Sequence, residues 1–169
     1  TQPQSYTPKH LADKILTTRS SIDGERKLVT VLFADVADYT SISEKLDPEE
    51  VHQIMDGTFK ILMDEIHKFE GTINQFTGDG VMALFGAPVA HEDDAVRAVS
   101  AALELQTLPA ELDYIADVKI GVSQGQMRTG AYGGTMRRTY GVLGDEVNMS
   151  ARLMQAAKPG QILIKDTVW

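Results

Sequence analysis

Residues 28–34 read LVTVLFA, a run that is apolar or β-branched at nearly every position and leads directly into Asp35. A continuous apolar run of this length is typical of a strand that is buried on both faces. The sequence therefore predicts a central, buried strand over residues 28–34. We expect this strand to stop at Asp35 and to offer the carboxylate at a position fixed by the backbone.

A helix is predicted further along the chain, beginning after Asp47. Asp47, Pro48 and the acids at 49–50 supply an N-cap, a first-position proline and early negative charge. Apolar residues then recur at roughly helical spacing as far as Phe69, and Gly71 ends the pattern. This spacing indicates an amphipathic helix that packs on a sheet.

A hairpin is predicted next, because Gly78-Asp79-Gly80 separates two short strand-like runs at 72–76 and 81–85. The remaining pattern indicates a helix at 92–105, a strand at 118–122 and a flexible glycine-containing stretch at 125–134. A further helix at 145–155 and a last strand at 161–164 follow. The order β-α-β-β-α-β followed by α-β predicts an α+β fold, a ferredoxin-like sandwich in which one mostly antiparallel sheet is covered by helices.

The composition limits the classes of function. The 169 residues are enough for one compact domain, and we divide them into an arm, short helix and linker at 1–27 and a main domain at 28–169. A net charge of -8 argues against a nucleic-acid partner. There is no cysteine and no apolar run of membrane-spanning length, so we expect a cytoplasmic domain, and the first residue Thr1 suggests a fragment of a longer chain.

Two aspartates have the chemistry of a metal site. Asp35 follows the predicted buried strand and Asp79 occupies the predicted hairpin turn, so neither lies on a long loop. Magnesium prefers oxygen ligands and usually combines one or two carboxylates with substrate phosphates. Residues 36–41 turn into a polar helix start whose free N–H groups suit phosphate oxygens. Taken alone, each aspartate also fits an ordinary role, a turn residue for Asp79 and a helix cap for Asp35.

Three ordered segments then resemble a known family. Residues 33–40 (FADVADYT), 78–83 (GDGVMA) and 144–152 (GDEVNMSAR) are similar to the two metal motifs and the Asn-x-x-x-Arg signature of class III adenylate and guanylate cyclases. The resemblance implies that two divalent ions, Mg²⁺ or Mn²⁺, are held by Asp35 and Asp79, with Val36 as a further metal contact. It also places phosphate-binding groups at Ala37, Asp38, Tyr39 and Thr40.

The same resemblance implies the reaction and the assembly. Asn148 and Arg152, one helical turn apart, would orient the ribose and neutralise phosphate charge as ATP is converted to cyclic AMP, and Lys119 would contact the phosphates. Lys119 fits equally well as a solvated lysine on a strand. Family members contribute the aspartates and the Asn-Arg pair from opposite subunits, which implies a head-to-tail homodimer with two shared sites.

The base pocket departs from the family pattern. Many adenylate cyclases have a lysine and an aspartate or threonine against adenine, whereas the matching positions here hold Gln75 and Gly141. A glutamine amide can pair with adenine or guanine, so ATP is favoured only by analogy. A guanylate cyclase, or a degenerate domain that binds nucleotide and regulates a partner, remains the alternative.

Two other observations bear on the assignment. A diguanylate cyclase would show a Gly-Gly-Asp/Glu type turn, which Gly78-Asp79-Gly80-Val81 does not supply. Family domains usually continue into a further hairpin that carries a phosphate-binding lysine, but this sequence ends at Trp169. Either this C-terminal hairpin is truncated here, or part of the grip on the triphosphate is lost. We also expect regulatory domains in a longer chain.

Overall fold

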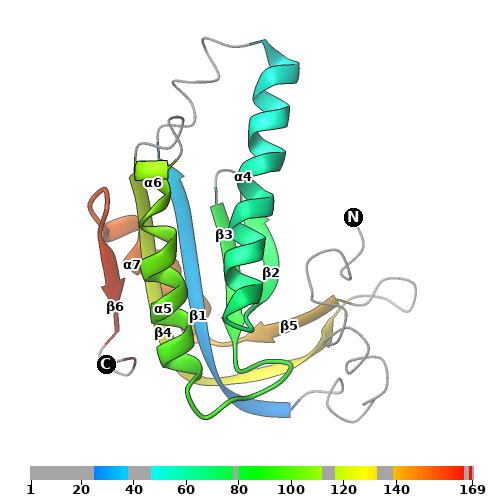
Figure 1. The fold of residues 1–169 in the computed structure, drawn as a ribbon. Helices are drawn as coiled ribbons and strands as arrows, with labels where there is room; N and C mark the ends of the chain where they lie inside the picture. The colour runs from blue at the N-terminus through cyan, green and yellow to red at the C-terminus, as the bar shows by residue number, and fades with distance from the viewer. Residues whose placement is uncertain are drawn as a thin grey trace.

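The structure, a computed structural model, describes residues 25–37, 47–77, 80–111, 117–132, 139–165 and 168. These residues form a six-stranded sheet with helices on both faces (Figure 1). The strands are β1 (Glu25–Ala37), β2 (Thr72–Thr77), β3 (Gly80–Phe85), β4 (Asp117–Tyr132), β5 (Thr139–Leu143) and β6 (Ile162–Ile164). The helices are α4 (Pro48–Lys68), α5 (Asp94–Leu105), α6 (Leu108–Glu111) and α7 (Asp145–Ala156).

The sheet order is β2-β3-β1-β4-β5, and β6 pairs with β4 beside this path. β1 is antiparallel to both of its neighbours, β3 and β4. The β2–β3 and β4–β5 pairs are antiparallel as well, whereas β6 runs parallel to β4. The succession β1-α4-β2-β3-α5-β4 in this sheet order is the ferredoxin-like arrangement. The predicted α+β fold with a mostly antiparallel sheet is therefore confirmed.

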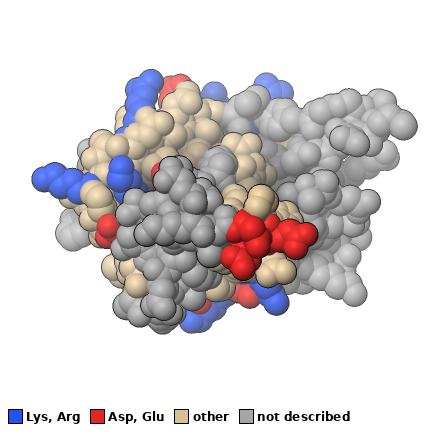
Figure 2. Space-filling view, turned by 90° about the horizontal axis from the view of Figure 1, so that it is seen from above, with Lys and Arg blue, Asp and Glu red and all other residues tan. Residues whose placement is uncertain are grey.

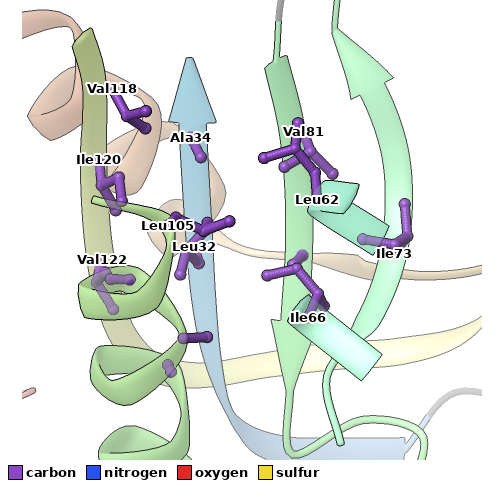
Figure 3. Close-up of a cluster of buried hydrophobic side chains, with 14 of the residues drawn as sticks. Leu32, Ala34, Leu62, Ile66, Ile73, Val81, Leu105, Val118, Ile120 and Val122 are labelled. Atoms are coloured by element: carbon purple, nitrogen blue, oxygen red, sulfur yellow. The ribbon is translucent and has the colours of Figure 1, made fainter. Parts of the chain in front are cut away.

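Each face of the sheet has its own hydrophobic core. α4 and α5 cover one face, where β1 contributes Leu32 and Ala34, and α7 lies behind the other (Figure 1). Figure 3 shows the first core, in which side chains from four strands meet those of both helices; the labelled residues are Leu32, Ala34, Leu62, Ile66, Ile73, Val81, Leu105, Val118, Ile120 and Val122. The second core, towards α7, contains Val29, Val31, Phe33, Met82, Leu84, Ala87 and Met127. β1 thus alternates between two buried faces, which explains its continuous apolar sequence.

The predicted start of α4 is confirmed. The Asp47 side chain accepts a hydrogen bond of 2.9 Å from the backbone N–H of Glu50, and Pro48 opens the helix. At the other end the helix stops at Lys68, before the predicted Gly71. The backbone N–H of Gly71 then donates to the carbonyl of Ile66 at 2.9 Å, which closes the helix against the start of β2.

Several element boundaries differ from the sequence-based prediction. β1 continues to Ala37, so Asp35 lies inside the strand rather than at its end. The predicted flexible stretch is wrong at Gly125 and Gly130, because β4 continues through both while it pairs with β1 and then β5. α5 begins at Asp94 and β6 at Ile162, each slightly later than predicted. β5 and the short α6 had no predicted counterpart.

The predicted N-terminal arm falls mostly outside the described residues, and β1 already begins at Glu25. The division at residue 27 therefore stays a prediction. Within the part of the chain that the structure describes, no helix combines the length and the apolar composition needed to cross a membrane.

Candidate active site

Asp35 lies between two strands near one end of the sheet. Its alignment partner on β3 is Gly80, and its partner on β4 is Lys119. Gly80 approaches β1 so closely that a Cβ atom there would be 2.1 Å from the Ala34 carbonyl oxygen and 3.1 Å from the Asp35 Cα. Only glycine fits at this position. Gly80 is the chain neighbour of Asp79, which lies outside the described residues.

Three of the predicted site residues share one face of the sheet. Directly opposed residues of antiparallel strands point to the same side, so Lys119 lies on the same face as Asp35. Gln75 is aligned with Met82, which is aligned with Phe33, two positions before Asp35 on that face. Because Phe33 belongs to the α7-facing core, Asp35, Lys119 and Gln75 all lie on the side that carries α7.

The side chains in this group differ in accessibility. Asp35 and Lys119 are half-buried, whereas Gln75 is exposed. β2 shifts its register between Ile73 and Gln75, so a bulge immediately precedes the glutamine. Bulges re-aim side chains at the edge of a sheet. The exposed amide of Gln75 is therefore available to a ligand on the α7 side.

The residues that follow Asp35 are only partly described. Val36 is 1% exposed and belongs to the core under α4 and α5, so any metal contact from this residue would come from its backbone. Ala37 is the last residue of β1 and is aligned with Asp117. The other predicted phosphate contacts, Asp38, Tyr39 and Thr40, lie outside the described residues.

α7 presents the predicted Asn-Arg pair to solvent. The helix packs on the sheet through Val147, Ala151 and Met154. Asn148 and Arg152 are each one residue further along and are both exposed. Neither side chain makes a hydrogen bond or an ion pair within the described part of the chain, so both are available to a bound molecule or to another subunit.

The second predicted base contact lies elsewhere in the sheet. Gly141 is on β5 and is aligned with Gly130 of β4. In the sheet order, β5 and the Gln75-bearing strand β2 are at opposite ends of the path. The structure therefore does not bring Gln75 and Gly141 together on neighbouring strands, and their common pocket stays a prediction.

Acidic side chains dominate part of the surface at this end of the molecule. Seen from above, the described surface shows a group of carboxylates (Figure 2). The start of α4 supplies exposed Asp47, Glu49 and Glu50. Among the described residues, no group of three or more His, Asp or Glu side chains could hold a metal ion. A cation site made of Asp35, Asp79 and substrate oxygens therefore stays a prediction, because Asp79 lies outside the described residues.

The sequence analysis did not single out an ion pair that lies at the start of α7. Lys165 Nζ contacts Glu146 Oε1 at 2.7 Å, and Glu146 is only 12% exposed at its side chain. Glu146 was considered only as part of the 144–152 motif. The pairing of Lys165 could not be predicted from the sequence, because its partner depends on the position of β6 beside β4.

Comparison with known proteins identifies the family to which this fold belongs. A family model described as the adenylate and guanylate cyclase catalytic domain matches residues 23–169. The crystal structure of the guanylyl cyclase Cya2 is 36% identical, with a TM-score of 0.80, and the match covers 87% of this chain and 79% of that one. The adenylyl cyclase CyaB from P. aeruginosa is 30% identical, with a TM-score of 0.79, over 87% of this chain and 81% of that one.

A curated relative is a much longer protein. An uncharacterized protein of Mycobacterium tuberculosis is 34% identical over 149 residues, which is 86% of this chain but 26% of the relative. The chain therefore spans about a quarter of the length of this relative.

Proposed function

Because the chain belongs to the adenylate and guanylate cyclase family, being matched by its catalytic-domain model over residues 23–169, we propose that it converts ATP to 3′,5′-cyclic AMP and pyrophosphate. The observation that carries the proposal is the placement of Asp35. This carboxylate is aligned with Gly80, the chain neighbour of Asp79, and with Lys119, and the nearness of a carboxylate and an ammonium group at one end of the sheet supports the proposed metal and phosphate contacts.

The proposed reaction is an intramolecular displacement. The ribose 3′-oxygen attacks the α-phosphorus, its proton is lost to solvent, and pyrophosphate leaves in line. Two divalent cations, when bound, would acidify the 3′-hydroxyl and neutralise charge on the phosphates. Asp35 and Asp79 would hold these ions. Lys119 would bind a phosphate oxygen from the strand next to Asp35, on the same face of the sheet.

Asn148 and Arg152 would act from a second subunit. Both are exposed on α7 and make no polar contact within the described residues, as expected for side chains that project across an interface. Arg152 would stabilise the charge that develops on the phosphates, and Asn148 would orient the ribose. This arrangement requires a head-to-tail homodimer in which each site draws on both chains.

GTP is the second candidate substrate, and Gln75 is the residue that favours considering it. Its exposed amide offers both a donor and an acceptor, so it can pair with either purine. The two solved relatives carry different titles, a guanylyl cyclase and an adenylyl cyclase. A third possibility is a degenerate domain that binds nucleotide and regulates a longer chain.

A direct assay separates these possibilities. Purified protein is incubated with ATP or with GTP in the presence of Mn²⁺, and the product is identified by chromatography against both cyclic nucleotides. Formation of cyclic AMP from ATP supports the proposal. Formation of cyclic GMP from GTP, with no cyclic AMP from ATP, assigns a guanylate cyclase. Nucleotide binding without a cyclic product at any protein concentration would contradict an enzymatic role.

A further inference from the structure

The start of α7 rests directly on β4. A Cβ atom at Gly121 would be 2.3 Å from the Ser150 carbonyl oxygen, and one at Gly125 would be 2.6 Å from the Glu146 side chain. Between these two glycines, Ser123 is fully buried and donates a hydrogen bond of 2.8 Å to the Glu146 carbonyl. We call Gly121, Ser123 and Gly125 the α7 contact strip. Its small residues let the helix backbone touch the strand.

This close contact does not by itself fix the rotation of the helix. α7 has Gly144 at its N-cap position, without a side-chain capping hydrogen bond. Its packing residues are apolar, and apolar contacts are not directional. The Ser123 hydrogen bond fixes one point of the first turn, and a second directional contact away from that point is needed to hold the helix in one rotation on the strip.

Glu146 supplies that contact. Its carboxylate lies against Gly125, and its Oε1 atom accepts from Lys165 Nζ at 2.7 Å. Lys165 is itself held on β4, because its backbone N–H donates to the Val122 carbonyl at 2.9 Å. The ion pair therefore connects the first turn of α7 to the sheet through two separate attachments.

The charge of Glu146 makes the carboxylate depend on Lys165 as its partner. The Glu146 side chain is 12% exposed, and its second oxygen, Oε2, is buried and has no hydrogen-bond partner in the part of the chain that the structure describes. A buried carboxylate is costly unless it is paired, so Lys165 is the group that makes this position tolerable. Moving the helix would separate the two charges in a poorly solvated place.

We propose that Glu146 and Lys165 are a positioning pair that fixes the rotation of α7 on β4 and thereby the direction in which Asn148 and Arg152 project. The inference rests on the proposed cyclase function. Asn148 follows Glu146 by two residues, about 200° around the helix, so a rotation that moves Glu146 moves Asn148 by a similar amount. A misplacement of about 1 Å at a reacting centre can lower a rate by about 10²-fold.

The test compares single, double and conservative variants of the pair. Glu146→Gln and Lys165→Met each remove one charge, the double variant Glu146→Gln/Lys165→Met removes both, and Lys165→Arg keeps the pair. Matched controls are Glu104→Gln and Lys158→Met, which make the same changes at exposed positions outside the proposed site. The measurements are kcat and KM with Mn²⁺ and nucleotide, thermal melting, and amide hydrogen exchange over residues 145–150.

We expect both single variants to lower kcat about ten- to a hundredfold, with KM changed less than about threefold, because the oriented groups act in the transition state. In the double variant kcat should fall only about fivefold, which is less than in either single variant, because no unpaired buried charge remains. Lys165→Arg and both controls should stay within about twofold of the wild type. Exchange over 145–150 should be faster in the single variants than in the controls.

The proposal is overturned if the folded single variants keep kcat within about twofold of the wild type. It is also overturned if the loss of activity comes from a raised KM and not from a lowered kcat. If the single variants do not fold, the double variant decides, and a wild-type kcat there overturns the proposal as well. A wild-type protein without cyclase activity contradicts the proposed function instead. In that case unchanged exchange in Lys165→Met also shows that the pair does not hold α7.

Discussion

Asp35 and Lys119 are aligned directly across the β1–β4 pair and lie on the same face of the sheet. A carboxylate and an ammonium group at directly opposed positions attract each other and share one patch of surface. Gly80 flanks Asp35 from the opposite strand and leaves no room for a side chain there. One short row across three strands thus joins a group suited to cations with a group suited to phosphates.

Loss of either aspartate should abolish cyclisation. Asp35→Ala and Asp79→Ala each remove a proposed metal ligand, and we expect kcat to fall by about 10³-fold, because metal-ion catalysis contributes several kcal/mol. Thermal melting should still be cooperative, since neither substitution adds bulk. Asp64→Ala, at an exposed position of α4, is the matched control and should retain full activity. Near wild-type turnover of Asp35→Ala at saturating Mn²⁺ would show that the two-metal assignment is wrong.

Two inactive chains should complement each other. If each site takes Asp35 from one chain and Arg152 from the other, mixing Asp35→Ala with Arg152→Ala should restore one complete site per heterodimer. The specific activity of the wild type should also rise with protein concentration. Activity is measured after the mixture has been shown by native mass spectrometry to contain heterodimers. No recovery in that mixture argues for sites built within one chain.

Base selectivity should be weak and open to improvement. We expect the wild type to prefer ATP over GTP only slightly, because Gln75 can present either its donor or its acceptor. Gln75→Lys together with Gly141→Thr should raise the ATP preference, since a pocket that pairs fully with its substrate can reject an analogue by about 10⁴–10⁵-fold. The measurement is kcat/KM for both nucleotides in the wild type and the double variant. Strong selectivity in the wild type would place base recognition on other residues.

The glycines of the fold should respond oppositely to alanine. Gly57 lies within α4, and a Cβ there would have no neighbour within 4 Å, so Gly57→Ala should stabilise the protein by about 0.4–1 kcal/mol. Gly80→Ala should destabilise it by about 1–3 kcal/mol or more, because the new Cβ would overlap the Ala34 carbonyl. Urea unfolding of both variants measures these changes. Equal effects at the two positions would contradict the close β1–β3 approach.

A buried hydroxyl on the central strand offers a second stability test. Thr30 is fully buried, and its Oγ1 atom has no hydrogen-bond partner among the residues that the structure describes. Thr30→Val removes this unpaired group and should raise the free energy of unfolding by about 1 kcal/mol. Thr58→Val is the control, because the Thr58 hydroxyl donates to the Ile54 carbonyl at 2.8 Å and its loss should bring no gain. A destabilised Thr30→Val would indicate that the hydroxyl has a partner in solution.

Local sequence signals were sufficient to predict an element where a single segment determines its own structure. Asp47 and Pro48 mark the start of α4 because capping depends only on neighbouring residues. The apolar run at 28–34 predicts a strand buried on both faces, and the structure places it at the centre of the sheet. The ferredoxin-like order follows from such segments taken in sequence.

Contacts between segments that are distant in the sequence could not be predicted from local sequence signals. Gly125 suggested flexibility, yet it lies within β4, where the Glu146 side chain occupies the space that a Cβ would take. The extension of β1 past Asp35 depends on its pairing with β4. For the candidate site, the motifs predict roles for Asp35, Asn148 and Arg152, but the position of Lys165 beside Glu146 requires the parallel pairing of β6 with β4.

The central position of β1 also has a consequence for biosynthesis. Thr30 is aligned with Phe85 on one side and with Gln124 on the other, so within the described residues β1 pairs with strands that are made much later than itself. At about 5–20 residues per second, its apolar run waits on the order of ten seconds for β4 to be synthesised. Sheets closed by such distant pairings fold slowly, because the loop must be closed before its contacts form. A ribosome-bound chain that ends before β4 should therefore remain sensitive to protease and should bind chaperones through β1.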